Sequence, residues 1–222
     1  MAGMVVLLST LLAEAGFAHG FPTRDTADAE LLGELSRDAI IEVRQVHGAR
    51  AIEAPEAGGA EADAIVGRDR NVAVGVRVAD CVPLLVADEA TGQVAAIHAG
   101  WRGIVAGVVK AGVDLLGGRK LLAAIGPCIG PCCFEVGLDV AGQIAGASEG
   151  ERVIDAHAGD KARADLRRAV RAQLRALGMA DDRIDDVPGC TKHDATRFHS
   201  FRRDGAKSGR MLSAIATRVH RP

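Results

Sequence analysis

The feature that most constrains the fold is a series of short, strongly apolar runs between residues 62 and 100. The runs VPLLV (82–86) and VAAI (94–97) contain only apolar residues instead of alternating apolar and polar ones. A strand with one solvated face alternates, whereas a strand buried on both faces does not. We therefore expect these runs to form the centre of a sheet that is covered on both sides.

Other elements are predicted from β-rich runs bounded by turn residues and from apolar residues spaced three and four apart. The predicted strands are 18–24, 39–46, 62–67, 71–78, 81–88, 93–100, 120–127, 183–187 and 209–219, and the predicted helices are 101–117, 137–147 and 161–178. The sequence shows no repeat or linker, so we interpret residues 1–222 as a single α/β domain. The expected architecture is a layered sandwich with mixed β-sheets covered by helices.

Charge and composition argue against several classes of partner. The chain has 27 Lys and Arg against 29 Asp and Glu, and aromatic residues make up only 3%. We expect no nucleic-acid partner, because neither a basic surface nor an aromatic stacking platform is indicated. We expect no membrane partner either, since no apolar run approaches the ~18 residues that span a bilayer.

The cysteine count and the N-terminal residues indicate the compartment. The five cysteines are an odd number, and three of them crowd into CIGPCC (128–133), which is not a disulfide framework. No Lys or Arg precedes Arg24, and Glu14 interrupts the first apolar stretch, so a signal peptide is disfavoured. These patterns favour a cytoplasmic protein.

Three polar side chains lie beside apolar runs where apolar packing would be easier: His47 in VRQVHG, Cys81 in VADCVPLL and His98 in AAIHAGWRG. Two imidazoles and one thiolate form a three-ligand set for Zn²⁺ that leaves one position open, as in catalytic sites. The intervals of 34 and 17 residues match no short metal motif, and a lone His or Cys at a strand end is more often a packed core group. The pattern alone leaves both interpretations open.

The neighbours of these residues suggest further roles. Asp80 is placed to accept the outer N–H of a ligating imidazole or to serve as an ordinary turn carboxylate. Gly100 and Gly103 allow a tight turn into a helix whose positive end would face His98 and favour an anion. Arg102 is a candidate phosphate ligand, and Trp101 is interpreted as a packed residue.

The remaining cysteines are interpreted differently. Cys128, Cys132 and Cys133 are expected to be small buried residues at a turn, with neighbouring cysteines facing opposite sides and no further thiol nearby. Cys190 begins a polar loop with His193, Asp194, His199, Arg202 and Arg203. That loop is predicted either to close a pocket or to be solvated.

Several motifs resemble those of a known family. They are HGFPTR (19–24), QVHG (45–48), ADAIV (62–66), ADCVPLL (79–85), AAIHAGWRG (95–103), AIGPCIG with FEVG (124–137), and CT followed by FRRDG and SGR (190–210). The chain is similar to the laccase-domain, or YfiH-like, proteins, which were called polyphenol oxidases and later zinc-dependent purine nucleoside enzymes. The motifs occur in the same order across nearly the whole chain, so the resemblance is specific.

The resemblance implies an α/β sandwich and a zinc ion held by His47, Cys81 and His98. It implies phosphorolysis of adenosine, inosine, guanosine or methylthioadenosine to free base and ribose 1-phosphate, with adenosine deamination at the same site. The partners are then purine nucleosides and phosphate. The implied catalytic residues are Cys81, His98 and Asp80, and the implied substrate-binding residues are Arg24, Gln45, Arg102, Cys190 and Arg202.

The sequence departs from the family after Arg24. Only 18 residues, DTADAELLGELSRDAIIE, separate Arg24 from Val43. Relatives usually carry a longer segment there that is rich in Gly and contains Asn. We expect the wall of the pocket formed by this segment to be missing or rebuilt.

Three other functions compete with the nucleoside hypothesis. Two His and one Cys are also the core of a blue-copper site, but seven His in the chain are too few for a multicopper laccase. Cys81 with His98 as its base would make a metal-free cysteine hydrolase. A role in editing peptidoglycan precursors, as linked to some relatives, is the fourth hypothesis.

Overall fold

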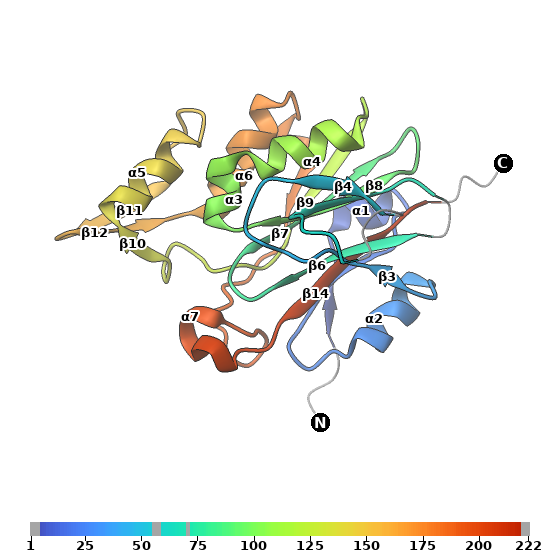
Figure 1. The fold of residues 1–222 in the computed structure, drawn as a ribbon, viewed down its shortest axis with the longest axis horizontal. Helices are drawn as coiled ribbons and strands as arrows, with labels where there is room; N and C mark the ends of the chain where they lie inside the picture. Colours follow the sequence, from blue (N-terminus) through green and yellow to red (C-terminus); the bar gives the residue numbers. More distant parts are fainter. Residues whose placement is uncertain (1–4, 55–58, 70–71, 219–222) are drawn as a thin grey trace.

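The computed structural model describes residues 5–54, 59–69 and 72–218, and it consists of two packed β-sheets with helices on their outer faces (Figure 1). The larger sheet has six strands in the order β13 (Ile184–Asp186), β9 (Leu121–Ile125), β7 (Val82–Asp88), β8 (Val94–Ala99), β5 (Ala64–Gly67) and β4 (Ala51–Glu53). The outermost pairs, β13–β9 and β4–β5, are parallel, and the inner pairs are antiparallel. The sheet is therefore mixed.

The second sheet has five strands in the order β1 (Val6–Leu7), β2 (His19–Pro22), β14 (Met211–Ala216), β6 (Ala73–Val78) and β3 (Ile40–Ile41). Its inner face packs on the larger sheet. Val76 of β6 and Ile215 of β14 share a buried apolar cluster with Leu85 of β7 and Ala96 of β8. This cluster is one of the two main cores of the molecule.

Helices cover the other face of the six-stranded sheet. They are α3 (Trp101–Ala106), α4 (Val108–Leu116) and α6 (Leu166–Ala176). Leu84, Val86 and Ile97 of the sheet pack against Ile104 and Val109 of these helices in a second buried cluster. Alternate residues of β7 and β8 thus enter the two cores, which is why both strands are apolar throughout.

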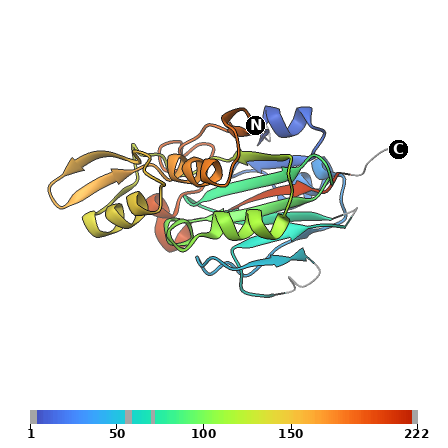
Figure 2. The same ribbon diagram turned by 90° about the horizontal axis from the view of Figure 1, so that it is seen from above.

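The smaller elements lie around this sandwich (Figure 2). The helix α2 (Asp28–Leu35) packs on the outer face of the five-stranded sheet through Leu31 and Leu35. A three-stranded sheet of β10 (Glu135–Gly137), β12 (Lys161–Ala164) and β11 (Ile154–Ala158) projects to one side together with α5 (Leu138–Gly146). The short helices α1 (Thr10–Glu14) and α7 (Phe201–Asp204) and two 3₁₀ turns (Asp181–Arg183 and Gly205–Lys207) complete the described elements.

The α/β class and the helix-covered mixed sheets are confirmed, but two predicted helices are wrong in extent. The predicted helix 101–117 is divided because Gly107 adopts a left-handed conformation (φ 89°) between α3 and α4. The predicted helix 161–178 begins only after Asp165, whose side chain accepts from the N–H groups of Arg167 and Arg168. Residues 161–164 instead form β12.

Two further predictions concern the shorter segments. The predicted strand 39–46 is reduced to β3, which pairs with β6 over two residues. The segment after Arg24, which the resemblance led us to expect to be shortened, forms α2. Part of the predicted strand 71–78 falls on Asn71, which lies outside the described residues.

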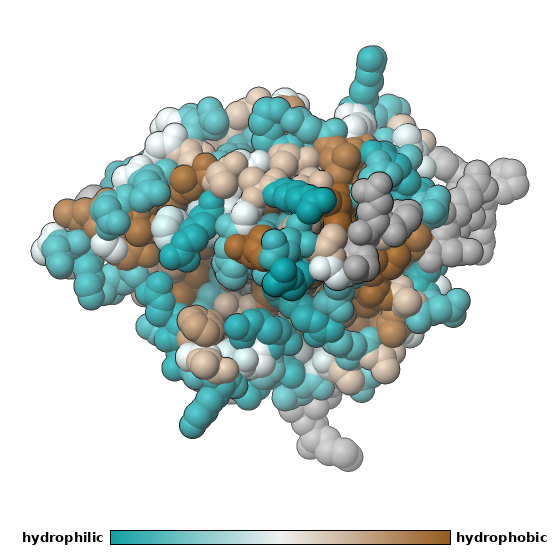
Figure 3. Space-filling model, in the orientation of Figure 1, coloured by the Kyte–Doolittle hydropathy of each residue, from teal (hydrophilic) through white to brown (hydrophobic). Residues whose placement is uncertain are grey.

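Hydrophilic residues occupy most of the face seen in Figure 1, with hydrophobic patches between them (Figure 3). Within the described ranges, the structure contains no helix that is both long and apolar enough to cross a membrane.

Candidate metal centre and adjoining cavity

Strand register places Cys81 and His98 side by side. The strands β7 and β8 are antiparallel, with Pro83 opposite His98 and Val82 opposite Ala99. Cys81 immediately precedes β7 and lies on the same face of the sheet as Leu85, because side chains alternate between the two faces along a strand. By the same alternation, His98 lies on the same face as Ala96. Both side chains therefore point toward the space between the sheets, at the end where β8 finishes and β7 begins.

Gly100 leaves room for the sulfur atom. A Cβ atom at this position would lie 3.0 Å from Cys81 Sγ and 3.3 Å from His47 Cδ2. Any larger residue would push these two side chains away from each other or from His98. The absence of a side chain at Gly100 thus creates the hollow in which the three groups meet.

His47 comes from the loop between β3 and β4, and Asp63 fixes the shape of this loop. The Asp63 carboxylate is fully buried and accepts from the backbone N–H groups of Val46, His47 and Gly48 at 3.2, 2.9 and 2.7 Å. His47 itself has a left-handed backbone (φ 61°), which is uncommon for a residue other than glycine. The three hydrogen bonds offset the cost of this conformation.

Asp63 also orients His98. Asp63 Oδ1 lies 2.7 Å from His98 Nδ1, and the carbonyl of Asp63 accepts from the backbone N–H of His98 at 2.7 Å. Because the carboxylate is an acceptor, Nδ1 carries the proton and Nε2 is left to face Cys81 and His47. One buried carboxylate thereby positions both imidazoles.

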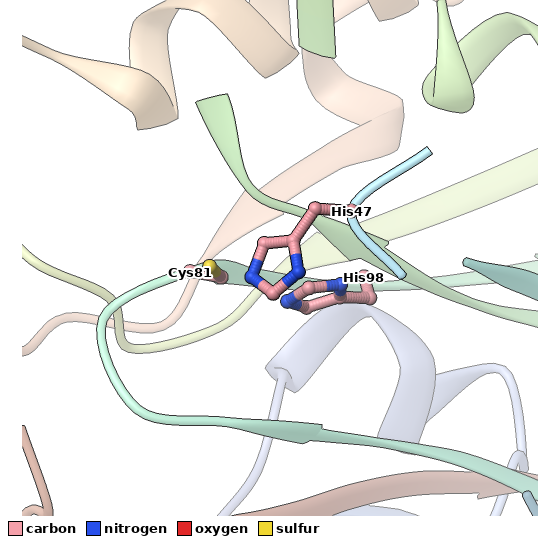
Figure 4. A group of neighbouring side chains, drawn as sticks. All are labelled: His47, Cys81 and His98. Carbon is pink, nitrogen blue, oxygen red and sulfur yellow. The ribbon is translucent and has the colours of Figure 1, made fainter. Parts of the chain in front are cut away.

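The donor atoms of His47, Cys81 and His98 all lie within 4.8 Å of one another (Figure 4). The two imidazole rings meet edge to face, with centroids 4.8 Å apart. His47 is exposed, Cys81 is partly buried and His98 is buried. Two nitrogens and one sulfur around a point that is open on the His47 side fit a three-ligand Zn²⁺ site, and the same donors also suit copper.

The protonation of the three groups is coupled. Burial raises the pKa of Cys81, but hydrogen bonds with His47 and His98 outweigh this effect and lower it to about 7. Burial lowers the pKa of His98, yet the hydrogen bonds with Asp63 and Cys81 raise it to about 9. Burial also raises the pKa of Asp63, whereas its bonds with His98 and the loop N–H groups bring it below its ordinary value. In the metal-free site the Cys81 thiolate and the Asp63 carboxylate are therefore paired with a protonated His98, and a bound cation would replace the proton on His98 Nε2.

Of the two roles that the sequence left open for Asp80, the structure contradicts the imidazole acceptor and supports the turn carboxylate. The outer N–H of His98 is bound by Asp63, not by Asp80, because Asp63 ends the loop that faces β8. Asp80 has a left-handed backbone (φ 92°), and its two carboxylate oxygens accept from Thr191 Oγ1 and from the backbone N–H of Arg202, both at 2.6 Å. It therefore holds the 191–202 segment against the start of β7.

A cavity of about 660 Å³ opens beside the three donors. Its apolar walls include Trp101, Phe134 and Phe201, and its polar walls include Asp80 and four arginines, namely Arg77, Arg102, Arg202 and Arg210. This volume is in the range of small-molecule sites. Trp101 is only partly buried and lines the cavity, in addition to packing on the core as predicted.

The arginines of the cavity differ in how their charge is balanced. Arg77 forms ion pairs with Asp28 of α2 and with Glu42. Arg102 stacks on Trp101 at 4.5 Å, and Arg202 donates to the carbonyl of Glu135 at 2.7 Å and lies 5.2 Å from the Phe134 ring. Within the described part of the chain neither Arg102 nor Arg202 has a carboxylate partner, so both offer positive charge to a ligand.

Of the other predicted substrate-binding residues, Gln45 lines the cavity. However, its side-chain amide is bound to the backbone N–H and carbonyl of Arg77, at 2.7 and 2.8 Å. Arg24 is not part of the cavity wall, and it donates to the carbonyl of Ala195. Cys190 is also outside the wall, and its sulfur lies 3.6 Å from Cys132 Sγ.

The turn expected in CIGPCC is confirmed, but the interpretation of its cysteines was wrong in three respects. Only Cys128 is buried, whereas Cys132 is exposed and Cys133 is partly buried. Residues 131–133 form a turn rather than a strand, so Cys132 and Cys133 are not forced to opposite faces. A further thiol, that of Cys190, does lie nearby.

Asp63 is a residue of the candidate site that the sequence analysis missed, as are Phe134 and Phe201 of the cavity wall. Asp63 lies in the ADAIV motif, just before β5, where a carboxylate with 0% exposure is unusual. The charged residue at the start of a buried strand was the available signal.

Known proteins match this chain over most of its length. A family model described as multi-copper polyphenol oxidoreductase laccase matches residues 24–218. A purine nucleoside phosphorylase of Pseudomonas aeruginosa is 39% identical over 175 residues, which are 77% of this chain and 71% of that protein. An adenosine deaminase from an unknown prokaryotic organism is 36% identical over 196 residues, 80% of this chain and 75% of that protein.

A solved structure supports the same assignment. The crystal structure of a Neisseria meningitidis protein has a TM-score of 0.85 and 27% identity, and the match covers 97% of this chain and 99% of that one. Together with the ordered motifs and the convergence of His47, Cys81 and His98, these matches show that the chain belongs to the family described as multi-copper polyphenol oxidoreductase laccases, whose members include the YfiH-like proteins.

Proposed function

We propose that the protein is a zinc-dependent purine nucleoside enzyme. It phosphorolyses adenosine, inosine, guanosine and methylthioadenosine to the free base and ribose 1-phosphate, and it deaminates adenosine at the same site. The observation that carries the proposal is the position of His47, Cys81 and His98, which meet in the wall of a cavity large enough for a nucleoside. The names of the relatives, a purine nucleoside phosphorylase and an adenosine deaminase, support it.

The metal is held by His47, Cys81 and His98 in this proposal. When bound there, a Zn²⁺ ion with three protein ligands supplies a Lewis acid with one open position. Asp63 keeps the proton of His98 on Nδ1, which leaves Nε2 as a ligand. Asp63 and Cys81 also compensate the positive charge of the ion.

The apolar walls of the cavity suit a purine. Trp101, Phe134 and Phe201 present aromatic surface, and Phe201 is 52% exposed at α7. Flat aromatic faces bind a flat base by stacking and exclude water from its surface. The ribose then lies toward the polar part of the cavity.

The proposed phosphate site consists of Arg102 and Arg202. Their charges are not balanced by carboxylates of the described chain, and a guanidinium binds phosphate with two parallel hydrogen bonds. In phosphorolysis a phosphate oxygen forms the new bond to C1′ while the bond from C1′ to the base nitrogen breaks. The arginines hold the attacking anion, and Asp80 fixes the backbone of Arg202 during this step.

The test is chromatography of adenosine incubated with zinc-loaded protein, with and without phosphate. Phosphorolysis gives adenine only when phosphate is present, and deamination gives inosine in either case. The variant His98→Ala is expected to lose both products, whereas His193→Ala, an exposed histidine outside the cavity wall, keeps them. If zinc-loaded protein converts no nucleoside, the proposal is wrong.

The same purified protein also distinguishes the nucleoside activity from two other candidate functions. A copper-dependent polyphenol oxidase would oxidise phenols after copper loading and absorb at about 600 nm as blue-copper sites do. The low pKa of Cys81 beside His98 also suits a metal-free cysteine hydrolase, in which a thiolate attacks and an imidazole moves the proton. Hydrolase activity would survive chelators and be abolished by alkylation of Cys81, whereas the nucleoside activity is lost on chelation and restored by zinc.

A further inference from the structure

A second group of thiols lies apart from the candidate metal centre and shares no residue with it. Cys132 Sγ is 3.5 Å from Cys133 Sγ and 3.6 Å from Cys190 Sγ, and all three sulfurs lie within 4.8 Å of one another. Cys132 is exposed, and the other two are partly buried. We refer to these three residues as the thiol cluster.

The cluster joins two segments that are far apart in the sequence. Cys132 and Cys133 lie in the turn that follows β9, and Cys190 lies in the loop that follows β13. A parallel bridge between Cys128 and Cys190 aligns these segments, and the backbone N–H of Thr191 donates to the carbonyl of Cys128 at 3.0 Å. Backbone pairing therefore holds the two segments side by side at the point where the three sulfurs meet.

The environment of Cys190 Sγ favours a negatively charged sulfur. The backbone N–H of Gly130 donates to it at 3.2 Å. Burial raises the pKa of Cys190, but the backbone N–H groups of Gly130 and His193 bring it below its ordinary value. The thiolate is the form in which cysteine binds metals.

The spacing of the sulfurs matches a metal site. Tetrahedral zinc with Zn–S bonds of about 2.3 Å places its sulfur ligands about 3.8 Å apart, close to the separations of Cys132 Sγ from Cys133 Sγ and from Cys190 Sγ. A disulfide between Cys132 and Cys190 would instead need the sulfurs to approach to about 2.05 Å and would leave Cys133 unused. Three converging sulfurs are better explained by one ion than by one covalent bond.

We propose that Cys132, Cys133 and Cys190 bind a second, thiophilic divalent ion of the Zn²⁺ class. No other His, Cys, Asp or Glu of the described residues completes the group, so water or an external ligand takes the fourth position. The ion connects the turn that carries Phe134 to the loop that leads to Arg202, and both residues line the cavity. Its role is to hold this wall of the cavity in place.

The test is a titration of metal-free protein with Cd²⁺, kept reduced by a phosphine under argon. Thiolate-to-metal absorption in the ultraviolet reports binding at each site. Wild-type protein is expected to bind two equivalents, and the variant with Cys132→Ser and Cys190→Ser one equivalent. His98→Ala is expected to retain the three-thiolate site, whose absorption per ion exceeds that of the one-thiolate site at Cys81. Cys128→Ala, a buried cysteine outside the cluster, is the matched control and keeps two equivalents.

Hydrogen exchange provides a second readout that does not involve catalysis. In His98→Ala protein, Cd²⁺ is expected to slow exchange in residues 190–202, and this effect disappears when Cys132 and Cys190 are also replaced. The proposal is overturned if wild-type protein binds a single equivalent that His98→Ala abolishes. It is also overturned if peptide mapping of protein alkylated at cell lysis shows a disulfide between Cys132 and Cys190. Neither outcome depends on nucleoside turnover.

Discussion

Replacement of Asp63 by Asn tests how the candidate metal centre is positioned. Oδ1 of Asp63 accepts from His98 Nδ1 and the N–H of His47, while Oδ2 accepts from the N–H groups of Val46 and Gly48. An Asn side chain has nearly the same shape but replaces one of these oxygens by an NH₂ group. In either orientation of the Asn amide, its NH₂ group faces two N–H donors that have a carboxylate oxygen as their acceptor in the wild-type protein.

The expected cost follows from these contacts. A buried donor without an acceptor costs about 1–3 kcal/mol, and we expect about 2–4 kcal/mol for the pair, since part of the 46–48 loop is exposed. His98 can relieve one clash by moving its proton to Nε2, but that nitrogen is then unable to bind a metal. We therefore expect Asp63→Asn to weaken metal binding by about 10–100-fold, the usual effect of losing an outer carboxylate.

The assays are urea unfolding of the metal-free protein and competition for zinc with a chromophoric chelator. Asp88→Asn is the matched control, because Asp88 is also buried and accepts from Ala90 N and Thr91 Oγ1 at the far end of β7. It should lower stability without changing zinc affinity. Wild-type zinc affinity in Asp63→Asn protein would refute the role assigned to this carboxylate.

Three further predictions address the ligands and the cavity. In metal-free protein, the rate of Cys81 alkylation, followed by mass spectrometry, should have a pH midpoint near 7. The reason is that the reactive thiolate is present above the pKa of Cys81 and is lost as the pH falls below it. A midpoint near 9 would contradict this pKa. Gly100→Ala should weaken zinc binding because its Cβ meets Cys81 Sγ at 3.0 Å, whereas Gly142→Ala, with no atom within 4 Å in α5, should leave affinity unchanged and raise stability by up to about 1 kcal/mol. Arg102→Gln should raise KM for phosphate about tenfold or more while phosphate-independent deamination of adenosine is retained, and an equal loss of both reactions would show that Arg102 does not select phosphate.

The sequence predicted the central sheet well because the relevant signal is local. The continuous apolar runs of β7 and β8 follow from burial on both faces, and the two-residue period then places Cys81 and His98 on one side of adjacent strand ends. The convergence of these two side chains with His47 was accordingly anticipated. Residues 161–164 were predicted as the start of a helix because the apolar stripe of α6 begins at Leu166, two residues after this strand ends.

Features that depend on contacts between distant segments were not predictable in the same way. Asp63 positions the two imidazoles because the 46–48 loop folds over its carboxylate. In the sequence, however, Asp63 looks like an ordinary residue at the start of a strand. Cys190 reaches Cys132 across 58 positions through a parallel backbone bridge that leaves no periodic signal. The left-handed conformation of Gly107 was hidden by apolar residues that continue the helical spacing on both sides.

In the proposed enzyme, His47, Cys81 and His98 hold one metal ion beside the cavity. The most direct test is anomalous diffraction at the zinc absorption edge from crystals of zinc-loaded protein. We expect a peak about 2.0–2.3 Å from a ring nitrogen of His47, Cys81 Sγ and His98 Nε2, and we expect it to disappear in His98→Ala crystals. A map without a peak among these three atoms, from protein that still converts adenosine, would contradict it.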